Sequence, residues 1–555
     1  MMKKASLLFV CLMGLLALAA CKKNYEDEPL ERITEDYIWD VQDSAGIYAR
    51  NFLQNTYTYL PTGPSGLPAG YAGFNRIDNS VLDAASDDAI PSLTGSDISR
   101  FTNGSISSVS NPDDAWAKNY KGIRKANELL ANIDKVPMRD TQLKEWWKAE
   151  ARFLRAMFYY EMVKRYAGVP LIGDKVFSLE DDLQLPRNTF TECVDYIVSE
   201  CDNIRDKVRP DPIDDGNLGR ATRGAVLALK AKVLLLAASP LHNATSDPAL
   251  WKKAADASKE LVNLNAFSLE TSFATVFTAR KNKEVILAYQ RGQTNDVETN
   301  NAPVGYTTPV SRGYTSPTQE LVDAFGMKNG LPITDPASGY LASDPYKAAT
   351  RDPRFYLTVF TNGTQWLRRP VQTYEGGLDK PGGSAVQTKT GYYMRKFMAD
   401  MSNQTSYPTQ AHNFIIFRYA EVLLNLAEAL NEYQGPTAEV YKAVEDIRKR
   451  AGLVPFILKT GLTKDQMREA IRLERRVEMA FEEQRFWDLR RWKIAETVLN
   501  KPLNGMKIIR NANGSFTYQQ IQVSTPVFTA KMYLYPIPYS EIVKNSKLKQ
   551  NDGWN

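Results

Sequence analysis

Apolar residues recur at spacings of three and four along several long segments, and this period predicts amphipathic helices. The clearest segment runs from Leu143 to Tyr166 and should end at Gly168-Val169-Pro170, because glycine and proline do not continue a helix. Its apolar face comprises Trp146, Ala149, Phe153, Ala156, Met157, Tyr160 and Val163. Other predicted helices are Asp36–Thr56, Asp113–Ala131 with Asp113 as its cap, Thr189–Val208, Ala221–Ala238, Trp251–Leu264, Phe414–Glu432, Ala438–Ala451, Thr463–Phe481 and Glu483–Leu499. The chain is therefore predicted to be mostly α.

Small residues are placed where helices could cross. Ala221, Ala225, Ala228 and Ala231 lie close to one face of their predicted helix, which permits a close approach by a neighbour. Paired helices of this size with small residues at the crossings are similar to tetratricopeptide repeats. The spacing between pairs is irregular, so the period alone does not establish a repeat.

Two regions lack the helical period. Tyr57–Asn79 is rich in glycine and proline and is predicted to be loop, and Phe267–Tyr407 offers only short strand-like runs at Glu284–Tyr289 and Phe355–Phe360. The second region is too long for one surface loop, which favours a loop-rich lobe packed on the helices. We expect one body over 36–555, with a helical scaffold at about 36–56, 112–266 and 412–500 and a variable lobe at about 57–111, 267–411 and 501–555.

The amino-terminal residues have the three parts of a secretory signal peptide. Lys3 and Lys4 are followed by an apolar run from Ala5 to Ala20, and small residues precede Cys21. Leu18-Ala19-Ala20-Cys21 resembles a bacterial lipobox, so we expect a signal peptide at 1–20, lipidation of Cys21 and a tether over 21–35. Acyl chains on Cys21 would hold the protein to a membrane. The alternative is an ordinary signal peptide with a cysteine there by chance.

Composition and charge exclude some classes of protein. The 555 residues are 43% hydrophobic and 24% charged, as in globular proteins. The net charge of +5 does not indicate a protein that binds nucleic acid. Cys193 and Cys201 are eight residues apart on a predicted helix, so their α carbons would be about 12 Å apart, too far for a disulfide.

No catalytic or metal-binding motif is present, and no catalytic residue, metal ligand or cofactor is predicted. The only histidines are His242 and His412, and HExxH, CxxC, GxSxG and phosphate-loop patterns do not occur. Carboxylates are numerous, so a glycosidase pair at roughly 5–10 Å stays open. The Glu- and Arg-rich segment Ile471–Lys493 is predicted to form solvated ion pairs, with Glu469–Arg472 and Arg475–Glu478 at the required spacing.

Several stretches resemble the SusD/RagB family of bacterial outer-membrane lipoproteins, in the right order over nearly the whole chain. The longest are AEARFLRAMFYYEMVKRYAGVPLI (149–172), GRATRGAVLALKAKVLLLAASPLHN (219–243), FRYAEVLLNLAEALNE (417–432), IRLERRVEMAFEEQRFWDLRRWK (471–493) and YLYPIPYSEIVKNSKLKQNDGW (533–554). The shorter motifs SDDA (86–89), PTQELVDAFGMKNG (317–330), DPRFY (352–356) and IRKRAGL (447–453) also fit.

The resemblance implies four tetratricopeptide-like helix pairs that support a variable, mostly irregular lobe with short strands. It also implies a non-enzymatic protein of the outer membrane that faces the cell surface. Such a protein binds nutrient oligomers, usually glycans, and passes them to a SusC-like TonB-dependent transporter. Alternatives are a peptide-binding RagB-like lid, a lipid-anchored hydrolase, and a structural lid whose ligand contacts come chiefly from the transporter.

The loops contain the side chains that an oligosaccharide needs. Sugar rings stack on aromatic rings, and their hydroxyls pair with amide, carboxylate and guanidinium groups. The segment Ile90–Ser99, which follows the SDDA motif, has no aromatic residue, which makes starch recognition there doubtful. The ligand-binding candidates are Tyr57, Tyr59, Tyr71, Phe74, Asn75, Arg76, Tyr306, Arg312, Tyr314, Trp366, Arg368 and Tyr374.

Overall fold

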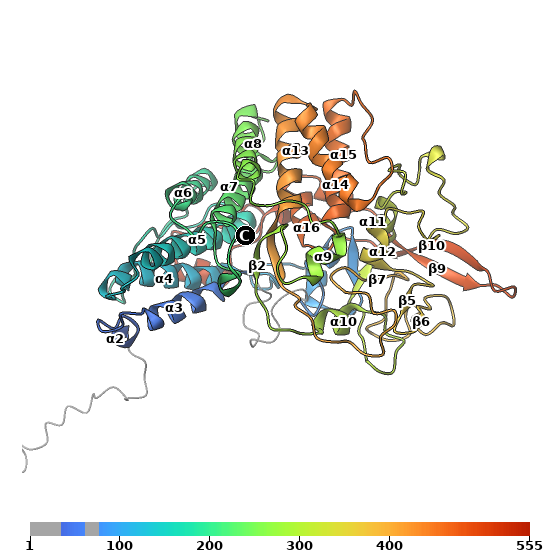
Figure 1. Cartoon of the computed structure of the whole chain (residues 1–555), viewed down its shortest axis with the longest axis horizontal. Coiled ribbons are helices and arrows are strands. Elements are labelled where there is room, and N and C mark those ends of the chain that lie inside the picture. The colour runs from blue at the N-terminus through green and yellow to red at the C-terminus, as the bar shows by residue number, and fades with distance from the viewer. Residues whose placement is uncertain (1–34, 62–76, 555) are drawn as a thin grey trace, which may run out of the picture.

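The computed structural model describes residues 35–61 and 77–554 (Figure 1). The predicted signal peptide, Cys21 and the candidates Tyr71, Phe74, Asn75 and Arg76 lie outside the described residues. Among the residues described, no helix combines the length and the apolar character needed to cross a membrane.

A scaffold of eight long helices packs in chain order, each against the next. Four antiparallel pairs follow from this order, which confirms the predicted tetratricopeptide-like scaffold. An earlier helix, α3 (Ile47–Tyr57), packs on the first pair. The pairs are α4 (Trp116–Asn132) with α5 (Thr141–Tyr166), α6 (Phe190–Ile204) with α7 (Arg223–Ala238), α8 (Pro248–Asn263) with α13 (Tyr419–Gln434), and α14 (Ala438–Ala451) with α15 (Lys464–Glu478).

Local sequence signals set the ends of these helices. The Asp140 side chain accepts a hydrogen bond from the Leu143 amide at 2.8 Å and so caps α5. Reciprocal capping boxes begin α6 at Thr189 and α15 at Thr463. Gly452, with φ of 85°, ends α14 in the left-handed conformation that glycine adopts without strain.

Small residues let the helices approach closely, as predicted: Ala225, Ala228 and Ala231 of α7 are buried, and so is Ala221, which lies just before this helix begins. Gly122 on α4 is another such position, because a β carbon there would lie 2.6 Å from the Phe158 ring of α5. On α5 the fully packed indole is Trp147, whereas Trp146 is half-buried beneath the Arg209 guanidinium. The two cysteines among the described residues, Cys193 and Cys201, are free and buried, in agreement with the spacing argument.

Short elements make up the lobe, and its strands pair two by two in the described part of the chain. The antiparallel pairs are β1 (Ala89–Pro91) with β3 (Thr315–Pro317), β2 (Val285–Tyr289) with β8 (Phe414–Arg418), β4 (Val359–Phe360) with β7 (Tyr393–Met394), β5 (Gln365–Trp366) with β6 (Arg369–Pro370), and β9 (Leu503–Arg510) with β10 (Phe516–Ser524). The short helices are α2 (Glu35–Ile38), α9 (Phe273–Thr278), α10 (Asp296–Asn301), α11 (Gln319–Ala324), α12 (Phe355–Thr358), α16 (Gln484–Arg491), α17 (Ala495–Leu499) and α18 (Tyr539–Lys544).

Several predicted boundaries were wrong. The helix predicted from Phe414 begins only at Tyr419, because the β-branched and aromatic run FIIFR pairs with β2 as a strand. The predicted strand Phe355–Phe360 is instead α12 followed by two strand residues. The helix predicted over Glu483–Leu499 is split into α16 and α17.

Three further expectations were wrong. The helix predicted over Asp36–Thr56 is interrupted between α2 and α3. The segment assigned to irregular lobe at 501–555 contains the longest strands described, β9 and β10, which project at the far end from α2–α6 (Figure 1). Asp113 does not cap α4, because its carboxylate pairs with Arg165 at 2.8 Å.

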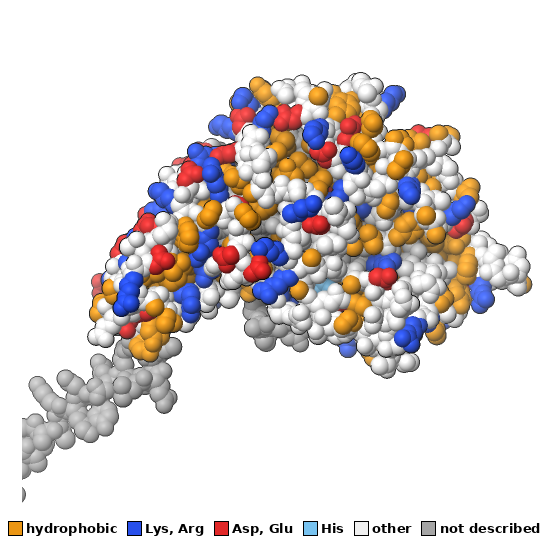
Figure 2. Space-filling view, viewed as in Figure 1, with side chains coloured by type: hydrophobic (Ala, Val, Ile, Leu, Met, Phe, Trp, Pro, Cys, Tyr) orange, Lys and Arg blue, Asp and Glu red, His pale blue; other side chains and the backbone are white. Residues whose placement is uncertain are grey.

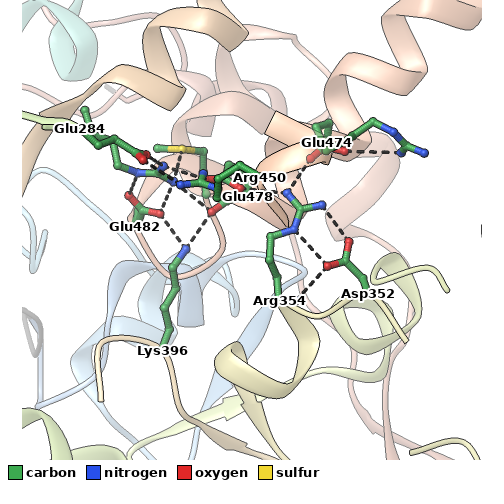
Figure 3. A network of polar contacts seen from close by, with 11 residues as sticks. Glu284, Asp352, Arg354, Lys396, Arg450, Glu474, Glu478 and Glu482 are labelled. Carbon is green, nitrogen blue, oxygen red and sulfur yellow. Dashed lines mark hydrogen bonds and ion pairs between the residues drawn. The ribbon is translucent and has the colours of Figure 1, made fainter. Parts of the chain in front are cut away.

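A buried network of ion pairs joins the lobe to the scaffold (Figure 3). Glu478 on α15 lies at its centre and accepts hydrogen bonds from the Arg418, Arg354 and Arg450 guanidinium groups, the first two at 2.7 and 2.9 Å. Burial by itself raises the pKa of Glu478, but the three arginines outweigh burial and hold that pKa below its usual range. The segment predicted to form solvated ion pairs thus forms buried ones, and the predicted Arg475–Glu478 pair is replaced by Arg475–Asp488 at 2.7 Å.

The same network also holds strands β2 and β8 in place. Arg418, the last residue of β8, also pairs with Glu284 at 2.7 Å and with Glu482 at 2.7 Å. Lys396, from the segment after β7, donates to Glu482 at 2.7 Å, and burial lowers its pKa to about 8. Each of these charges therefore has a partner supplied by another chain segment.

The SDDA motif is anchored in a related way. Asp87 pairs with Arg476 and Arg485 at 2.9 and 2.8 Å, and Asp88 pairs with Arg476 at 2.7 Å. Asp83 accepts from the backbone N–H of Phe481 and of Glu483 at 3.1 and 2.9 Å. This motif therefore fixes the early part of the lobe to the turn after α15.

On the face shown in Figure 2, acidic and basic side chains are interspersed over the α2–α6 end, without a field of one sign.

Replacing Glu478 with glutamine should lower the free energy of unfolding by about 3–5 kcal/mol, because it leaves buried guanidinium groups uncompensated. Urea unfolding followed by circular dichroism measures this change. Glu469→Gln on the same helix is the matched control, since its pair with Arg472 is 73% exposed on the glutamate side and should contribute at most about 0.5 kcal/mol. Equal effects of the two substitutions would contradict the structural role of the network.

Stability should also fall in acid. The pKa values of Glu478, Glu482, Glu428, Asp488 and Asp87 lie below their usual values in the folded protein, because arginine or lysine partners outweigh burial. Their stabilisation is therefore complete above about pH 5 and is lost as pH falls through the ordinary carboxylate range of about 4 towards the folded-state values. Asp83 and Asp88, whose pKa values are raised chiefly by burial, act in the opposite direction.

The measurement is the unfolding free energy at several pH values between 7 and 3. The wild-type protein should lose stability below pH 5, and Glu478→Gln should show a shallower dependence. A profile that is flat in this window for the wild type would overturn the assignment.

Candidate ligand-binding site

Three candidates predicted from the sequence come together in the lobe. The Tyr306 hydroxyl donates to the backbone oxygen of Trp366 at 2.7 Å, and Trp366 ends strand β5 two residues before Arg368. Tyr306 is half-buried and Arg368 is exposed, so both present side-chain surface to solvent. We call Tyr306, Trp366, Arg368, Arg369, Asp379 and Tyr407 the Tyr306 cluster.

The Trp366 side chain belongs to the core of the lobe and not to its surface. It is 0% exposed, its ring packs edge-on against Phe360, and its indole N–H donates to the Tyr407 hydroxyl at 3.2 Å. A sugar ring cannot stack on it in this conformation. Its role here is to support the β5–β6 hairpin beneath Tyr306, which corrects the expectation of a ligand contact.

Arg369 and Asp379, which the sequence did not single out, hold the Tyr306 ring in place. The Arg369 guanidinium lies over that ring, 3.7 Å from its centroid. Both oxygens of Asp379 accept from Arg369, at 2.7 and 3.1 Å, and one of them also accepts from the Gly305 amide at 2.8 Å. The ring is thus fixed before any ligand arrives, and the fixing cation is neutralised by its own carboxylate.

The turn of the β5–β6 hairpin is unusual in its residues. Leu367 and Arg368 have φ of 43° and 63°, a left-handed pair that normally requires Asn or Gly. Such residues cost of order 1–3 kcal/mol each and persist only where the surroundings hold them. Here the amides of Leu367 and Arg368 donate to Met401 and Ser402 oxygens at 3.1 and 2.8 Å, and the Arg368 side chain donates to the Asn403 oxygen. The tip therefore presents Arg368 in one fixed place.

Arg312 and Tyr314 lie at the edge of the Tyr306 cluster. The Arg312 side chain donates to the Tyr314 hydroxyl at 2.9 Å, and the neighbouring Ser311 hydroxyl is hydrogen-bonded to Tyr407 at 2.7 Å. Tyr314 is only 5% exposed, so of this pair Arg312 has the surface to meet a ligand. The Tyr314 backbone oxygen accepts from the Ser92 amide, which ties β3 to the segment after the SDDA motif.

The other described candidates lie elsewhere. Tyr57 is the last residue of α3, and its hydroxyl donates to Glu150 at 2.8 Å and accepts from the Ala221 amide at 2.9 Å, which makes it a link within the scaffold. Tyr59 packs on Phe158 of α5. Tyr374 packs against Phe516 of β10, away from the Tyr306 ring's contacts. The loop assignment of Tyr57 was therefore wrong.

The chemistry of the cluster suits binding. It offers a rigid half-buried ring, exposed guanidinium donors and ordered backbone groups, which match the apolar faces and hydroxyls of sugars. The histidines lie apart from it: His242 stacks on Phe190 at 3.6 Å and burial lowers its pKa to about 3, while His412 contacts Glu298 in the core. No group of three metal-ligating side chains occurs among the described residues.

Among the described residues, the larger cavities lie outside the cluster. One of about 590 Å³ is bordered by α4, α5 and α6, and one of about 360 Å³ lies between the segment preceding α7 and strand β2. Neither is lined by any of the ligand-binding candidates, and the larger one is surrounded by charges that largely pair with one another, such as Lys148 with Asp134 at 2.7 Å.

Comparison with known proteins places this arrangement in one family. Residues 283–554 match the model of the SusD family, and residues 76–235 match a SusD-like model described as starch-binding and associating with the outer membrane. The chain is 24% identical to SusD-like protein P38 of Formosa agariphila over 99% of both chains.

Solved structures share the fold. A SusD-like protein from Bacteroides fragilis is 29% identical with a TM-score of 0.76, and the match covers 95% of this chain and 99% of that one. A SusD-like carbohydrate-binding protein from the same species is 23% identical, again with a TM-score of 0.76, over 92% of this chain and 100% of that one. Two family models in sequence order and a common architecture over almost the whole length lead to one assignment: the chain belongs to the SusD/RagB family.

Proposed function

We propose that this protein binds oligosaccharides at the outer surface of the outer membrane, without cleaving them, and delivers them to a SusC-like TonB-dependent transporter. The observation that carries the proposal is the Tyr306 cluster, in which Arg369 holds the Tyr306 ring and the preceding residue, Arg368, presents an exposed side chain that donates to the Asn403 oxygen. Pre-ordered groups bind more tightly because less conformational entropy is lost on association.

The ligand class is supported from two directions. The family model over residues 76–235 is described as starch-binding, and one relative of known structure is described as carbohydrate-binding. In this chain, the cluster combines an aromatic face with guanidinium donors, and these match the apolar face and the hydroxyl groups of a sugar ring. The segment 90–99, without aromatic residues, contributes the buried strand β1, so the stacking groups come from the central lobe instead.

The expected affinity is modest. Each hydrogen bond to the ligand replaces one to water and contributes only about 0.5–1.5 kcal/mol. A few such bonds and one stacked ring, set against the cost of association, give dissociation constants of order micromolar to millimolar. Such weak binding suits a protein that hands its ligand on.

The membrane association is proposed through Cys21. The sequence Leu18-Ala19-Ala20-Cys21 resembles a lipobox, and lipidation of the cysteine would supply the anchor. A tether over 21–35 would then lead to α2, which begins at Glu35.

Tyr306→Ala and Arg368→Ala should each weaken oligosaccharide binding by tenfold or more, about 1.4 kcal/mol. The first removes the stacking face and the second a fixed donor. A screen of the purified lipid-free protein against oligosaccharides identifies the ligand, and isothermal titration then measures the variants. Tyr433→Ala is the control, because Tyr433 is an exposed tyrosine at the end of α13 on the scaffold.

Trp366→Ala should instead lower the free energy of unfolding by about 3–5 kcal/mol, as expected for a buried tryptophan. Normal binding by both Tyr306→Ala and Arg368→Ala would show that the site lies elsewhere. New reducing ends in the titration mixture would show that the protein is a hydrolase.

Cys21→Ser should abolish acylation and move the protein from the membrane fraction to the soluble fraction. Metabolic labelling with a fatty acid and fractionation of cells measure the two effects. Unlabelled wild-type protein, with equal membrane association of both forms, would contradict the anchor.

A further inference from the structure

The cavity of about 360 Å³ lies at the junction between the helical scaffold and the lobe, and we call it the junction cavity. Its scaffold wall is formed by the segment 211–220, which precedes α7, and its lobe wall by strand β2 with the loop before it. In Figure 1, α7 and β2 meet near the centre of the molecule, away from the β5–β6 hairpin. The cavity is within the size range of pockets that hold small molecules.

The two walls are fixed against one another by the fold itself. Gly219 has φ of 87°, and a β carbon there would lie 3.1 Å from the Ala288 oxygen, so the segment before α7 is pressed against β2. Phe267 packs on the first turn of α7, where a β carbon at Gly224 would lie 2.3 Å from its ring. The space is therefore pre-formed, which reduces the entropy that is lost when a ligand binds.

The inner surface of the junction cavity is largely apolar. Both walls supply apolar side chains, namely Pro212, Ile213, Leu218, Phe267, Val285 and Ile286. Ile213 and Phe267 are only half-buried, so a ligand that covers them removes further apolar surface from water. Water fills such a space poorly, because apolar walls give it few hydrogen-bond partners. The walls therefore favour a ligand with an apolar body.

The charged residues that line the cavity are mostly cations. They are one carboxylate and four basic side chains: Asp211, Arg220, Arg280, Lys281 and Lys283. The Asp211 carboxylate accepts from the Gly224 amide at 2.6 Å, so it is engaged at the amino-terminal end of α7. Arg220 pairs with the buried Glu150 at 2.8 Å. These two charges thus have their partners within the fold.

The other three cations come from the loop before β2. Lys281 pairs with Asp215 at 2.5 Å. Arg280 and Lys283 are exposed, and no carboxylate of the described residues lies within ion-pair distance of either side chain. The Arg280 side chain donates only to the Gln290 side-chain oxygen, at 3.4 Å. The mouth of the cavity therefore carries two cations that an anion could neutralise.

We propose that the junction cavity binds a small amphipathic anion, with an aliphatic or aromatic body and one carboxylate. The apolar body lies against Phe267 and Ile286, and the carboxylate meets Arg280 and Lys283 at the mouth. A guanidinium group matches a carboxylate in shape as well as in charge. At about 30 Å³ for each water, the volume corresponds to roughly a dozen water molecules, which sets the size of the ligand. Because no lining residue belongs to the Tyr306 cluster, this ligand and an oligosaccharide can be bound together.

The test uses the purified lipid-free protein and three small probes. 4-Phenylbutyrate has an apolar body and a carboxylate, 4-phenylbutanamide has the same shape without the charge, and glucuronate has the charge without the apolar body. Ligand-observed NMR and isothermal titration measure the three affinities. We expect 4-phenylbutyrate to bind at least tenfold more tightly than either of the other two probes.

Two sets of substitutions locate the bound probe. Arg280→Gln with Lys283→Gln should weaken binding of 4-phenylbutyrate at least tenfold and leave binding of the amide unchanged. The matched control is Arg152→Gln with Lys207→Gln, which removes two cations from the lining of the larger cavity and changes the net charge equally. Ala266→Phe, at a half-buried lining residue, reduces the volume and should weaken binding of both the acid and the amide.

Four outcomes would overturn the proposal. They are equal affinities for the acid and the amide, tighter binding of glucuronate than of 4-phenylbutyrate, an equal loss in the control variant, and no binding of the acid up to about 10 mM. Oligosaccharide affinity should be the same in the wild type and in all these variants. Its loss in the Arg280 and Lys283 variant, with normal binding by Tyr306→Ala, would place the oligosaccharide in the junction cavity and overturn this inference as well. Loss of oligosaccharide binding in Tyr306→Ala alone leaves the two sites separate, as proposed.

Discussion

The structure depends on the pairing of buried charges across segments that are distant in sequence. Glu478 accepts from arginines on β8, on α14 and in the loop before α12, so one carboxylate fixes the lobe to the last scaffold helices. The attraction between such charges is strong in a medium of low polarity, but so is the cost of removing them from water. The network is favourable only while it is complete, and this makes the position of the lobe specific. Asp87 and Asp88 repeat the arrangement with Arg476 and Arg485.

The ligand site inherits its rigidity from this attachment. Lobes made of two-stranded pieces are weak by themselves, because each strand pair buries little apolar surface. Here β2 and β8 run into Glu284 and Arg418, and β7, whose Tyr393 hydroxyl donates to the Asp379 backbone oxygen, is followed by Lys396, so these strands of the lobe end in the network. Within the cluster, a buried carboxylate again fixes an arginine, because Asp379 pairs with Arg369 and holds it over the Tyr306 ring. A site on irregular backbone thereby gains the fixed geometry that helices usually supply.

The sequence predicted the scaffold well because a long amphipathic helix repeats its signal over several turns. The bounds of α14 were predicted without error, and the ends of α6 and α15 follow from their capping residues. Predictions failed where partners are distant. FIIFR reads equally as strand or helix until β2 is known to lie beside it, and the pairing of Arg475 with Asp488 instead of Glu478 depends on α16. A spacing of three residues shows only which charges could meet along one helix.

Of the candidate site, the sequence indicated the loops but not the roles of their residues. Tyr306 and Arg368 were identified from their type and setting, and Arg312 lies at the edge of the same cluster. Trp366 was identified for the same reason and is buried, because the aromatic character that suits a sugar also suits a core. Arg369 and Asp379 were missed, since a stacking cation and its neutralising carboxylate have no local signature. The only local feature of the sequence that bears on this geometry is Leu367-Arg368, which forms a two-residue turn. The backbone conformation of that turn is not evident from the residue types.

The separation in sequence between partners also has a consequence for the order of folding. Asp83 accepts hydrogen bonds from the amides of Phe481 and Glu483, 398 and 400 residues later in the chain. Glu284 likewise pairs with Arg418, which comes much later in the chain. Closing such large loops is entropically costly and slow, so contacts of this kind form late. The early helix pairs can form from local contacts, but the lobe has no fixed place until α15 and the turn after it exist. A chain interrupted before residue 478 would therefore have helices and no ligand site.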